Sequence, residues 1–470
     1  MTSDVQADNQ GDVTATIVEF ARSVPVVDIP EEVIESAKVH ILDTLGVAFA
    51  GSVSDVARIV REDISAQGLS GQGSAIIGTS LSAPPRFAAF ANATAIHADN
   101  FDDTTPQLQA DRTGGIHASA AVLPVVLAEG QAIGASGLEM LRAYLAGVEV
   151  ASRLNHTIAA RHYGDGFHTT GTMNIFGATI AASILKKLDR AKTVNAIGIA
   201  ASHASGIRRN FGTMTEILHP AQAAQAGITT ADLAARGLTA AADALHGPGG
   251  YFAAAGGGFD SSEIVGRLGK PWVFYDPGVW IKPHPNGALT HPGAGCLLSL
   301  LVEHEIASEK IARISVKTND RVLKTLIHHN PVTGTQAKFS MEFTLAVVAI
   351  TRQAGLAEFT TGMLNRTDVR DIMAKVDYTA YDPPDDTYTN VTTLIDVLLQ
   401  DGQVLSGSAN YAVGSTSSPM SFDEVIEKFR GCAAYGRWPK EKIAEIEAIV
   451  RSLDKFENSE TLIHALINNE

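Results

Sequence analysis

The sequence predicts a mainly helical protein in which a smaller α+β region precedes a helical C-terminal tail. Three observations favour this class. Apolar-periodic stretches that mostly end at glycine fill residues 12–258, β-branched alternation and a hairpin signal follow Trp272, and helix signals return at 421–430 and 439–453. The α+β region is expected near 280–411. Long stretches poor in strand signals argue against a doubly wound parallel sheet.

The first region is expected to be a succession of helices. One helix is predicted at 29–50, because Pro30 and two glutamates occupy its first turn and Gly51 ends the apolar pattern. Further helices are predicted at 87–99, 137–154, 176–188 and 221–235. These stretches are longer than ordinary strands, which favours helix over sheet.

Strand signals appear in the second region. Residues 311–317 alternate and are β-branched, which predicts a strand. Residues 390–399 and 403–411 flank an Asp-Gly turn, which is a β-hairpin signal. The longer apolar stretch 338–352 is predicted to be a helix entered from a strand.

The charge balance excludes some classes of partner. The 470 residues contain 36 Lys and Arg against 51 Asp and Glu, which gives a formal charge of −15. Such an acidic chain is unsuited to non-specific nucleic-acid binding and to anionic membrane surfaces. No stretch approaches the ~18 apolar residues of a membrane span. We therefore expect neither nucleic acid nor membrane as a partner.

Cysteine usage and the N-terminus favour a reducing compartment. Cys296 and Cys432 are too few for a disulfide framework. Residues 1–11 are polar and acidic, lack the basic and apolar parts of a secretory signal, and are expected to be a disordered tail. A cytoplasmic protein is the resulting expectation.

The first motif that could carry chemistry is HADNFDDT at 97–104, where a helical pattern runs into a loop. Acidic groups at a helix C-terminus face an unfavourable dipole, and local rules are often broken at functional sites. The motif supplies Asn100, Asp102 and Thr104 as candidates. Two alternatives stay open: Asp102 or Asp103 caps the next segment, or the acids hold Mg²⁺.

The second motif is GFHTTGT at 166–172, just before an apolar helical stretch. Its His168 is expected near a helix N-terminus, where N–H groups and the dipole favour anions. That position lowers the pKa of a histidine, so the neutral imidazole can act as a base. Alternatively, Thr169 or Thr170 is an ordinary N-cap and His168 is a surface residue.

The third motif, at 205–220, places Arg208 and Arg209 in a Gly-rich loop ahead of a helix and ends near His219. Arginine binds carboxylates through two parallel hydrogen bonds, so both arginines are candidates for substrate binding. The alternative is that one or both are solvated.

The fourth motif is KPHPNGALTHP at 282–292, at the join between the two regions. Domain junctions are favoured places for pockets, and the prolines hold this strip extended. Lys282 and His291 are its candidates. The alternative is a rigid linker between the domains.

Familiar metal, nucleotide and hydrolase motifs are missing from the sequence. It contains no HExxH, no His-x-His, no Walker loop, no dinucleotide fingerprint after a strand and no GxSxG elbow. We therefore predict a site without metal or cofactor, in which histidine, lysine and arginine perform acid–base chemistry.

Taken together and in order, these motifs resemble those of a known family. HADNFDDT, HASAAVLP at 117–124, GFHTTGTMNIFG at 166–177, the stretch that ends GTMTEILH, KPHPNGALTHP and AKFS at 337–340 are similar to motifs of the MmgE/PrpD family. That family includes 2-methylcitrate dehydratase, cis-aconitate decarboxylase and iminodisuccinate epimerase. The likeness covers nearly all of the chain after the polar tail.

The resemblance implies a fold. It implies one discontinuous helical domain made of 12–279 and 412–470, and an α+β lid domain over 280–411. It also implies a homodimer, and a cleft between the domains that takes a small di- or tricarboxylic acid.

The resemblance implies site residues as well. Thr104, His117, His168 and Lys282 match positions that line the family's active site, and Asp102 is expected to orient the substrate or a histidine. Substrate-binding residues are expected at Arg208, Arg209, His219, Asn100, Glu216 and His291.

The chemistry implied is removal of a proton next to a carboxylate. His117 or His168 is expected to be the base and the other the acid, while Lys282 and Arg208 hold carboxylates and stabilise the developing enolate. The predicted reaction is that of a 2-methylcitrate-dehydratase-like hydro-lyase. An iminodisuccinate-like epimerase, a cis-aconitate-type decarboxylase and a non-catalytic family member are the alternatives.

Three positions depart from the family's motifs. Asn100 stands where the family has Asp, Glu216 where it has Lys, and Gly287 where it often has Cys or His. The loop that carries Asp111 and Arg112 is also longer than usual. A buried negative charge is costly in a pocket for a trianion. Either Glu216 turns away, or the substrate carries less negative charge or a cationic group.

Overall fold

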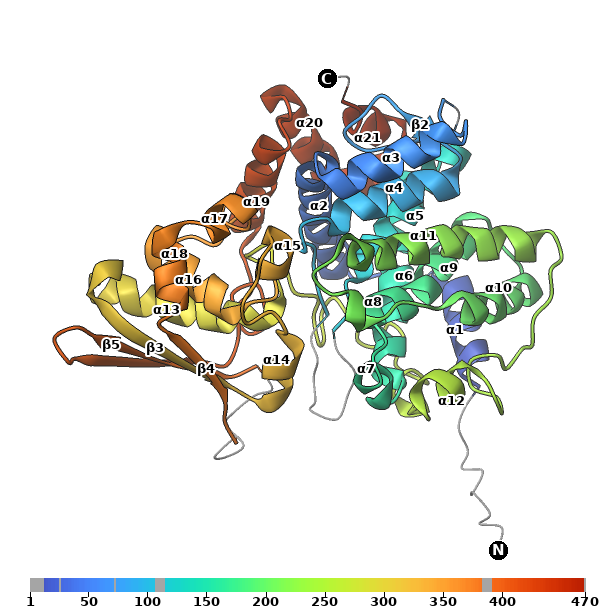
Figure 1. The fold of residues 1–470 in the computed structure, drawn as a ribbon. Helices are drawn as coiled ribbons and strands as arrows, with labels where there is room; N and C mark the ends of the chain where they lie inside the picture. Colours follow the sequence, from blue (N-terminus) through green and yellow to red (C-terminus); the bar gives the residue numbers. More distant parts are fainter. Residues whose placement is uncertain (1–11, 25–26, 72, 106–114, 383–390, 469–470) are drawn as a thin grey trace, which may run out of the picture.

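The computed structural model describes residues 12–24, 27–71, 73–105, 115–382 and 391–468. It has a large helical part and a smaller α+β part that lie side by side (Figure 1). The expected fold class is confirmed. The expected tail at 1–11 lies outside the described residues.

The helical part is built around long helices that are buried on nearly all sides. They are α2 (Glu31–Ser52), α4 (Pro85–His97), α5 (Ala118–Ile133), α6 (Gly137–Thr157), α9 (Asn174–Leu185) and α11 (Met214–Ala235). In α9 every residue except Ile184 is buried, as expected of a helix that is apolar all round. Small residues allow this packing: a Cβ on Gly177 of α9 would lie 2.4 Å from the carbonyl oxygen of Gly147 in α6.

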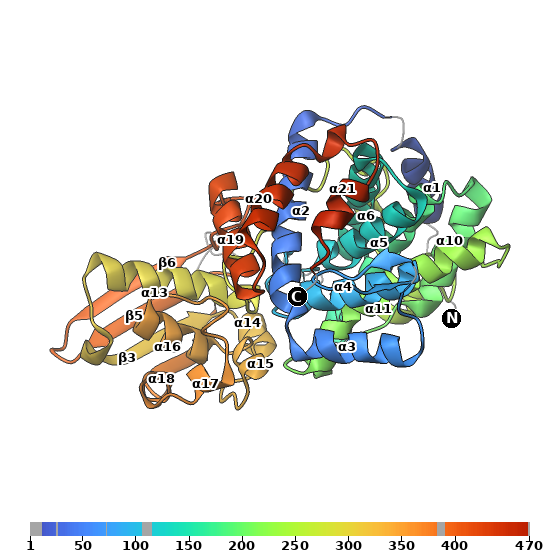
Figure 2. The ribbon, with the colours of Figure 1, turned by 90° about the horizontal axis from the view of Figure 1, so that it is seen from above.

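Shorter and peripheral helices complete the helical part. They are α1 (Val13–Ser23), α3 (Asp55–Ala66), α7 (Arg161–Gly164), α8 (Thr169–Thr172), α10 (Arg190–His203), α12 (Tyr251–Gly256), α19 (Phe422–Tyr435), α20 (Lys440–Arg451) and α21 (Glu460–Ala465). A two-stranded ribbon joins β1 (Ser74–Ala75) to β2 (Ser82–Ala83). The C-terminal helices return beside α2 (Figure 2), and Phe429 of α19 packs against Gly46.

The α+β part contains a mixed four-stranded sheet in the order β4-β3-β5-β6. Its strands are β3 (Ile311–Thr318), β4 (Val376–Ala380), β5 (Thr393–Leu399) and β6 (Val404–Ala409). β4 runs parallel to β3, and the other neighbours are antiparallel. Helices α13 (His291–Glu303), α16 (Met341–Thr351) and α18 (Thr367–Met373) cover one face (Figure 1). One covered face explains the alternating burial of β5.

Three short helices, α14 (Asp320–Thr325), α15 (Gly334–Ala337) and α17 (Thr361–Leu364), complete this part.

The buried apolar residues form two main cores. The first joins residues of 13–279 to residues of 426–466, and the second lies within 294–405. The predicted domain limits fall between these sets and stay a prediction.

The expected helices and the hairpin are confirmed, with two differences. Residues 338–352 were expected to be entered from a strand, and this is wrong: α15 precedes α16, and the Ser340 hydroxyl caps α16 by accepting from the backbone N–H of Phe343. In addition, α11 begins at Met214, seven residues before the Ala-rich stretch, with Pro220 inside it. The expected hairpin residue Asn390 lies outside the described residues.

Within the described ranges, no single helix has the length and apolar character needed to cross a membrane. One bent pair, α2 with α3, meets that test on length and composition alone, with an 81° bend between the two helices.

Candidate active site

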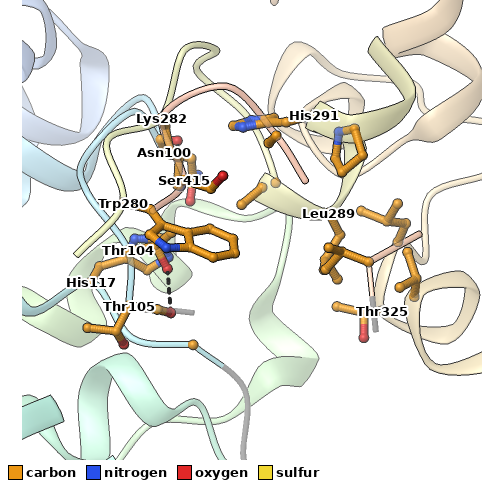
Figure 3. A pocket seen from close by; sticks show the side chains of 18 of the residues that line it. Asn100, Thr104, Thr105, His117, Trp280, Lys282, Leu289, His291, Thr325 and Ser415 are labelled. Carbon is orange, nitrogen blue, oxygen red and sulfur yellow. Dashed lines mark hydrogen bonds between the residues drawn. The ribbon is translucent and has the colours of Figure 1, made fainter. Parts of the chain in front are cut away.

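A cavity of about 620 Å³ lies between the helical part and the α+β part, and Figure 3 shows it from close by. Its wall includes most of the predicted site residues, namely Asn100, Thr104, His117, His168, Glu216, Lys282 and His291. The motifs that bear them are far apart in sequence, so the fold itself assembles this site. Lys282 lines the cavity instead of serving only as a linker.

His97 is the buried centre of the polar network. It ends α4, so the helix directs its imidazole toward the loop that follows. Its Nδ1 lies 2.9 Å from Asp102 Oδ2, and its Nε2 lies 3.2 Å from Glu216 Oε1. Both carboxylates accept, so both ring nitrogens donate and the ring is a cation. Burial opposes that charge, but Asp102 and Glu216 outweigh it and raise the pKa of His97 to about 9.

The two carboxylates beside His97 are held ionised. Burial would raise the pKa of Asp102, but the charge of His97 and the hydrogen bond from its ring lower it well below its usual range. Burial also opposes ionisation of Glu216, and the hydrogen bond from His97 lowers the pKa of that carboxyl. The network therefore carries a cation between two anions.

Glu216 and Asn100, two of the departures from the family motifs, contact each other. Glu216 lies in the first turn of α11, is buried, and lines the cavity, so it does not turn away. The Asn100 side-chain amide donates to Glu216 Oε2 at 3.3 Å. Asn100 has a φ of 54°, a left-handed conformation that asparagine adopts more readily than most residues.

Lys282 is buried beside this network. Its Nζ donates to the carbonyl oxygen of Asn100 at 2.8 Å. Burial lowers the pKa of Lys282 to about 8, although Asp102 and Glu216 act in the opposite direction. The ammonium is therefore mostly charged at neutral pH but gives up its proton more easily than an exposed lysine.

His117 is a neutral imidazole whose tautomer is fixed by its partner. Its Nδ1 lies 2.6 Å from the carbonyl oxygen of Asp103, which only accepts, so Nδ1 carries the proton and Nε2 has the lone pair. Burial and the charge of Lys282 lower the pKa of His117 to about 4. The geometry leaves Nε2 as a proton acceptor on a residue that lines the cavity.

His168 is also buried and neutral, and His219 lies behind it. His168 is the N-cap residue of α8, and its pKa is lowered well below the usual value by burial and by the nearby His219. The two Nδ1 atoms are 2.8 Å apart, so one donates to the other. The alternative of a surface histidine beside a threonine N-cap is wrong. The lowered pKa was expected, but its cause is burial, since α8 has only four residues.

Two other predicted residues support the site from its edges. Thr104 pairs with Trp280 through two backbone hydrogen bonds of 2.8 and 2.7 Å, which joins the first motif to the strip before Lys282. His291 donates from Nε2 to Asn286 Oδ1 at 2.6 Å, and burial lowers its pKa well below the usual value.

The acidic pair at 102–103 does not cap the next helix. His117 is the N-cap residue of α5, without a side-chain capping bond. Asp103 instead accepts from the hydroxyl of Ser119, and Asp102 contacts His97. Both carboxylates are fully buried, so the capping alternative is wrong and Asp102 belongs to the network.

The arginines lie differently from the expectation. Arg208 packs over the ring of Tyr163 at 4.0 Å and is absent from the cavity wall, and Arg209 is exposed. Arg321, which no motif indicated, lines the cavity from α14 and lies 5.8 Å from the same ring. Their roles in substrate binding stay a prediction. Asp111 and Arg112 lie outside the described residues.

One group of side chains has a spacing that a metal ion could use. Ligand atoms of His97, Asp102 and His117 all lie within 4.8 Å of one another. Both ring nitrogens of His97 donate to carboxylates, so binding of a metal by His97 would require the loss of a proton. The expectation of a metal-free site stays a prediction.

The fold and the site define a class of protein, and comparison with known sequences names its family. The MmgE/PrpD N-terminal domain matches residues 15–264, and the MmgE/PrpD C-terminal domain matches residues 284–455. The chain belongs to the MmgE/PrpD family, which confirms the resemblance found in its motifs.

Three relatives that match nearly the whole chain are named cis-aconitate decarboxylase. A cis-aconitate decarboxylase of Homo sapiens is 28% identical, covering 96% of this chain and 93% of its own. One of Mus musculus is 27% identical, covering 97% and 93%. One of Aspergillus terreus is 23% identical, covering 97% and 96%.

Proposed function

We propose that this protein is a cofactor-independent lyase that forms and protonates a carbanion next to the carboxylate of a small organic acid. The observation that carries the proposal is the pairing, in one cavity, of the His117 imidazole with the Lys282 ammonium. Such a pairing supplies a proton acceptor, a proton donor and a positive charge where an enolate develops.

Lys282 has two roles in this proposal. Its charge binds a substrate carboxylate and stabilises the negative charge that spreads onto that carboxylate when the carbanion forms. Its pKa of about 8 lies near neutral pH, where a general acid is most effective. His97, held as a cation between Asp102 and Glu216, offsets part of the negative charge of these two carboxylates.

His117 and His168 have different roles in proton transfer. His117 accepts at Nε2 because its Nδ1 is occupied by Asp103. His168 is the second candidate for proton transfer, and its contact with His219 offers a route for the proton away from the cavity.

Within this chemistry we favour decarboxylation, because the relatives reported above carry that name. The bond to the departing CO₂ breaks, its electron pair remains on the carbon as an enolate, and the Lys282 ammonium protonates that carbon. Dehydration is the second candidate. It is supported by the presence of both a base and an acid, since loss of water removes a proton and a hydroxyl.

One experiment separates these reactions. Protein treated with EDTA is incubated in D₂O with a panel of hydroxy-, imino- and unsaturated polycarboxylates, and the products are followed by NMR and by CO₂ release. CO₂ with deuterium on the product indicates decarboxylation, and an alkene formed without CO₂ indicates dehydration. Exchange at the α-carbon alone indicates epimerisation. No exchange and no product across the panel would contradict the proposal.

The finer features of assembly remain part of the proposal. A homodimer and a closing motion of the α+β part are expected from the family resemblance. Sedimentation of the purified chain tests the first, and proteolysis with and without a bound acid tests the second.

A further inference from the structure

The cavity has two chemically different halves. The helical part contributes the polar half, with Asn100, His117, Glu216 and, at the join, Lys282. The α+β part contributes mainly apolar side chains. In Figure 3, Leu289 and Thr325 lie on the far side of the cavity from Lys282, Asn100 and His117. We call the apolar half, formed by Phe211, Leu289, Val322, Leu326 and Phe339, the apolar arm.

The arm is a built feature of the fold. Phe211 and Phe339 stack with their ring centroids 5.3 Å apart, which joins the helical part to the α+β part. Val322 of α14 and Leu326, the C-cap residue of that helix, are almost completely buried. Buried apolar walls beside a polar centre are typical of sites that bind a ligand with a hydrocarbon portion.

Gly287 opens the arm. A Cβ at this position would lie 3.4 Å from Leu326 Cδ2 and 3.6 Å from Phe339 Cδ1, which are ordinary contact distances. Its φ of −59° suits any residue, so the backbone does not demand glycine here. The same Cβ would lie 3.4 Å from the carbonyl oxygen of Lys338, so the missing side chain leaves room for a methyl-sized group of the substrate beside Leu326 and Phe339.

The volume of the cavity and the charges of its wall also favour a substrate with an apolar portion. Pockets of roughly 300–1,000 Å³ hold drug-sized ligands, and this cavity of about 620 Å³ exceeds what a six-carbon acid needs. Among the residues that the structure describes, the wall of the cavity contains one lysine, Lys282, and one arginine, Arg321. Glu216 adds a negative charge to the same wall. A trianion is poorly matched to this balance.

We propose that the acid bound here carries an apolar substituent of several carbon atoms, which is seated in the apolar arm while its carboxylate lies at Lys282. This rests on the proposed function only for the position of the carboxylate. The substituent, through its buried methylenes, would then set the preference of the site among carboxylic acids.

Binding of unreactive acids tests the proposal without any turnover. Succinate and 2-alkylsuccinates from ethyl to hexyl are titrated into the full-length protein by calorimetry. Affinity is expected to rise about fourfold for each methylene that enters the arm, until the arm is full. Affinity that stays level or falls along the series, or no binding by any member, would overturn the proposal. Catalysis is judged separately by the D₂O experiment, so either proposal can fail alone.

Two variants in the apolar arm and one control variant test where the alkyl chain binds. Gly287→Val narrows the arm beside Leu326 and Phe339 and is expected to remove most of the chain-length dependence. Gly295→Ala is the matched control, because its Cβ in α13 would meet open space, and the series should be unchanged. Leu289→Asn, at a half-buried position, should reduce hexylsuccinate affinity at least tenfold relative to succinate. Thermal melts establish that each variant is folded, and an unchanged series in both arm variants would overturn the proposal.

Discussion

At the scale of single residues, the Asn100–Glu216 pair replaces the Asp and Lys of the family motifs. Exchanging one member alone leaves a mismatched buried contact. Asn100→Asp would place a second carboxylate beside Glu216, and Glu216→Lys would place an ammonium beside the charged His97. Each single variant should lose about 3 kcal/mol of unfolding free energy.

The double variant Asn100→Asp with Glu216→Lys should recover part of that loss, because a carboxylate and an ammonium then face each other. A coupling of about 1–3 kcal/mol is expected from denaturant unfolding of the wild type, both single variants and the double variant. Purely additive losses would mean that the two positions do not act as a pair.

The pH dependence of activity follows from Lys282 and His117. Lys282 must be charged, so kcat/KM should fall as the pH rises through about 8. His117 must be neutral, so kcat/KM should fall as the pH drops through about 4. The pH dependence of kcat/KM, measured with the substrate that the D₂O experiment identifies, tests both the basic and the acidic limb of this profile. Lys282→Met should remove the basic limb together with most of the activity, whereas an unaltered profile would contradict its role.

Several site residues could be predicted from the sequence because motifs marked them, but their partners could not. His97 opens the first motif, five residues before Asp102, yet its second partner, Glu216, is remote in the chain. Arg321 lies in no motif and reaches the cavity only because α14 packs against it. Residue type alone makes Arg208 a candidate for carboxylate binding, whereas its contact with Tyr163 depends on tertiary structure.

At the scale of elements, periodicity was enough to predict most helices, and turn chemistry was enough to predict the hairpin. Gly402, at φ 91°, provides the turn between β5 and β6 that the Asp-Gly pair indicated. The entry to α16 was missed because a four-residue helix leaves no periodic signal. Pro220 lies inside α11 and hid the true start of that helix, since proline normally marks a first turn.

The close approach of α6 and α9 depends on glycine. Gly177→Ala would bring a Cβ to 2.4 Å from the backbone oxygen of Gly147, so the helices must separate. A loss of about 1–3 kcal/mol is expected from chemical denaturation. Gly431→Ala in α19 is the control, because its Cβ meets open space and alanine favours a helix, so stability should rise by up to about 1 kcal/mol. Equal effects in the two variants would refute the packing argument.

At the scale of the whole molecule, the C-terminal helices complete the first core and hold the site's first motif. Lys428 of α19 forms an ion pair with Asp43 of α2 at 2.7 Å, with 5% and 0% of the two side chains exposed. The same ammonium donates to the carbonyl oxygen of Phe101 at 2.8 Å, next to Asp102. The tail thus connects the core to the loop that positions the acidic group of the network.

Removing this charge should therefore destabilise the whole fold. Lys428→Met leaves Asp43 buried without its partner, and burial already raises the pKa of that carboxyl. A loss of about 3–5 kcal/mol is expected in denaturant unfolding, and Asp43→Asn combined with Lys428→Met should lose less, since no buried charge remains. Arg58→Met is the matched control, because it breaks exposed pairs with Asp55 and Glu62 and should cost no more than about 1 kcal/mol. Similar losses in the buried and the exposed variant would show that the tail is not held by this pair.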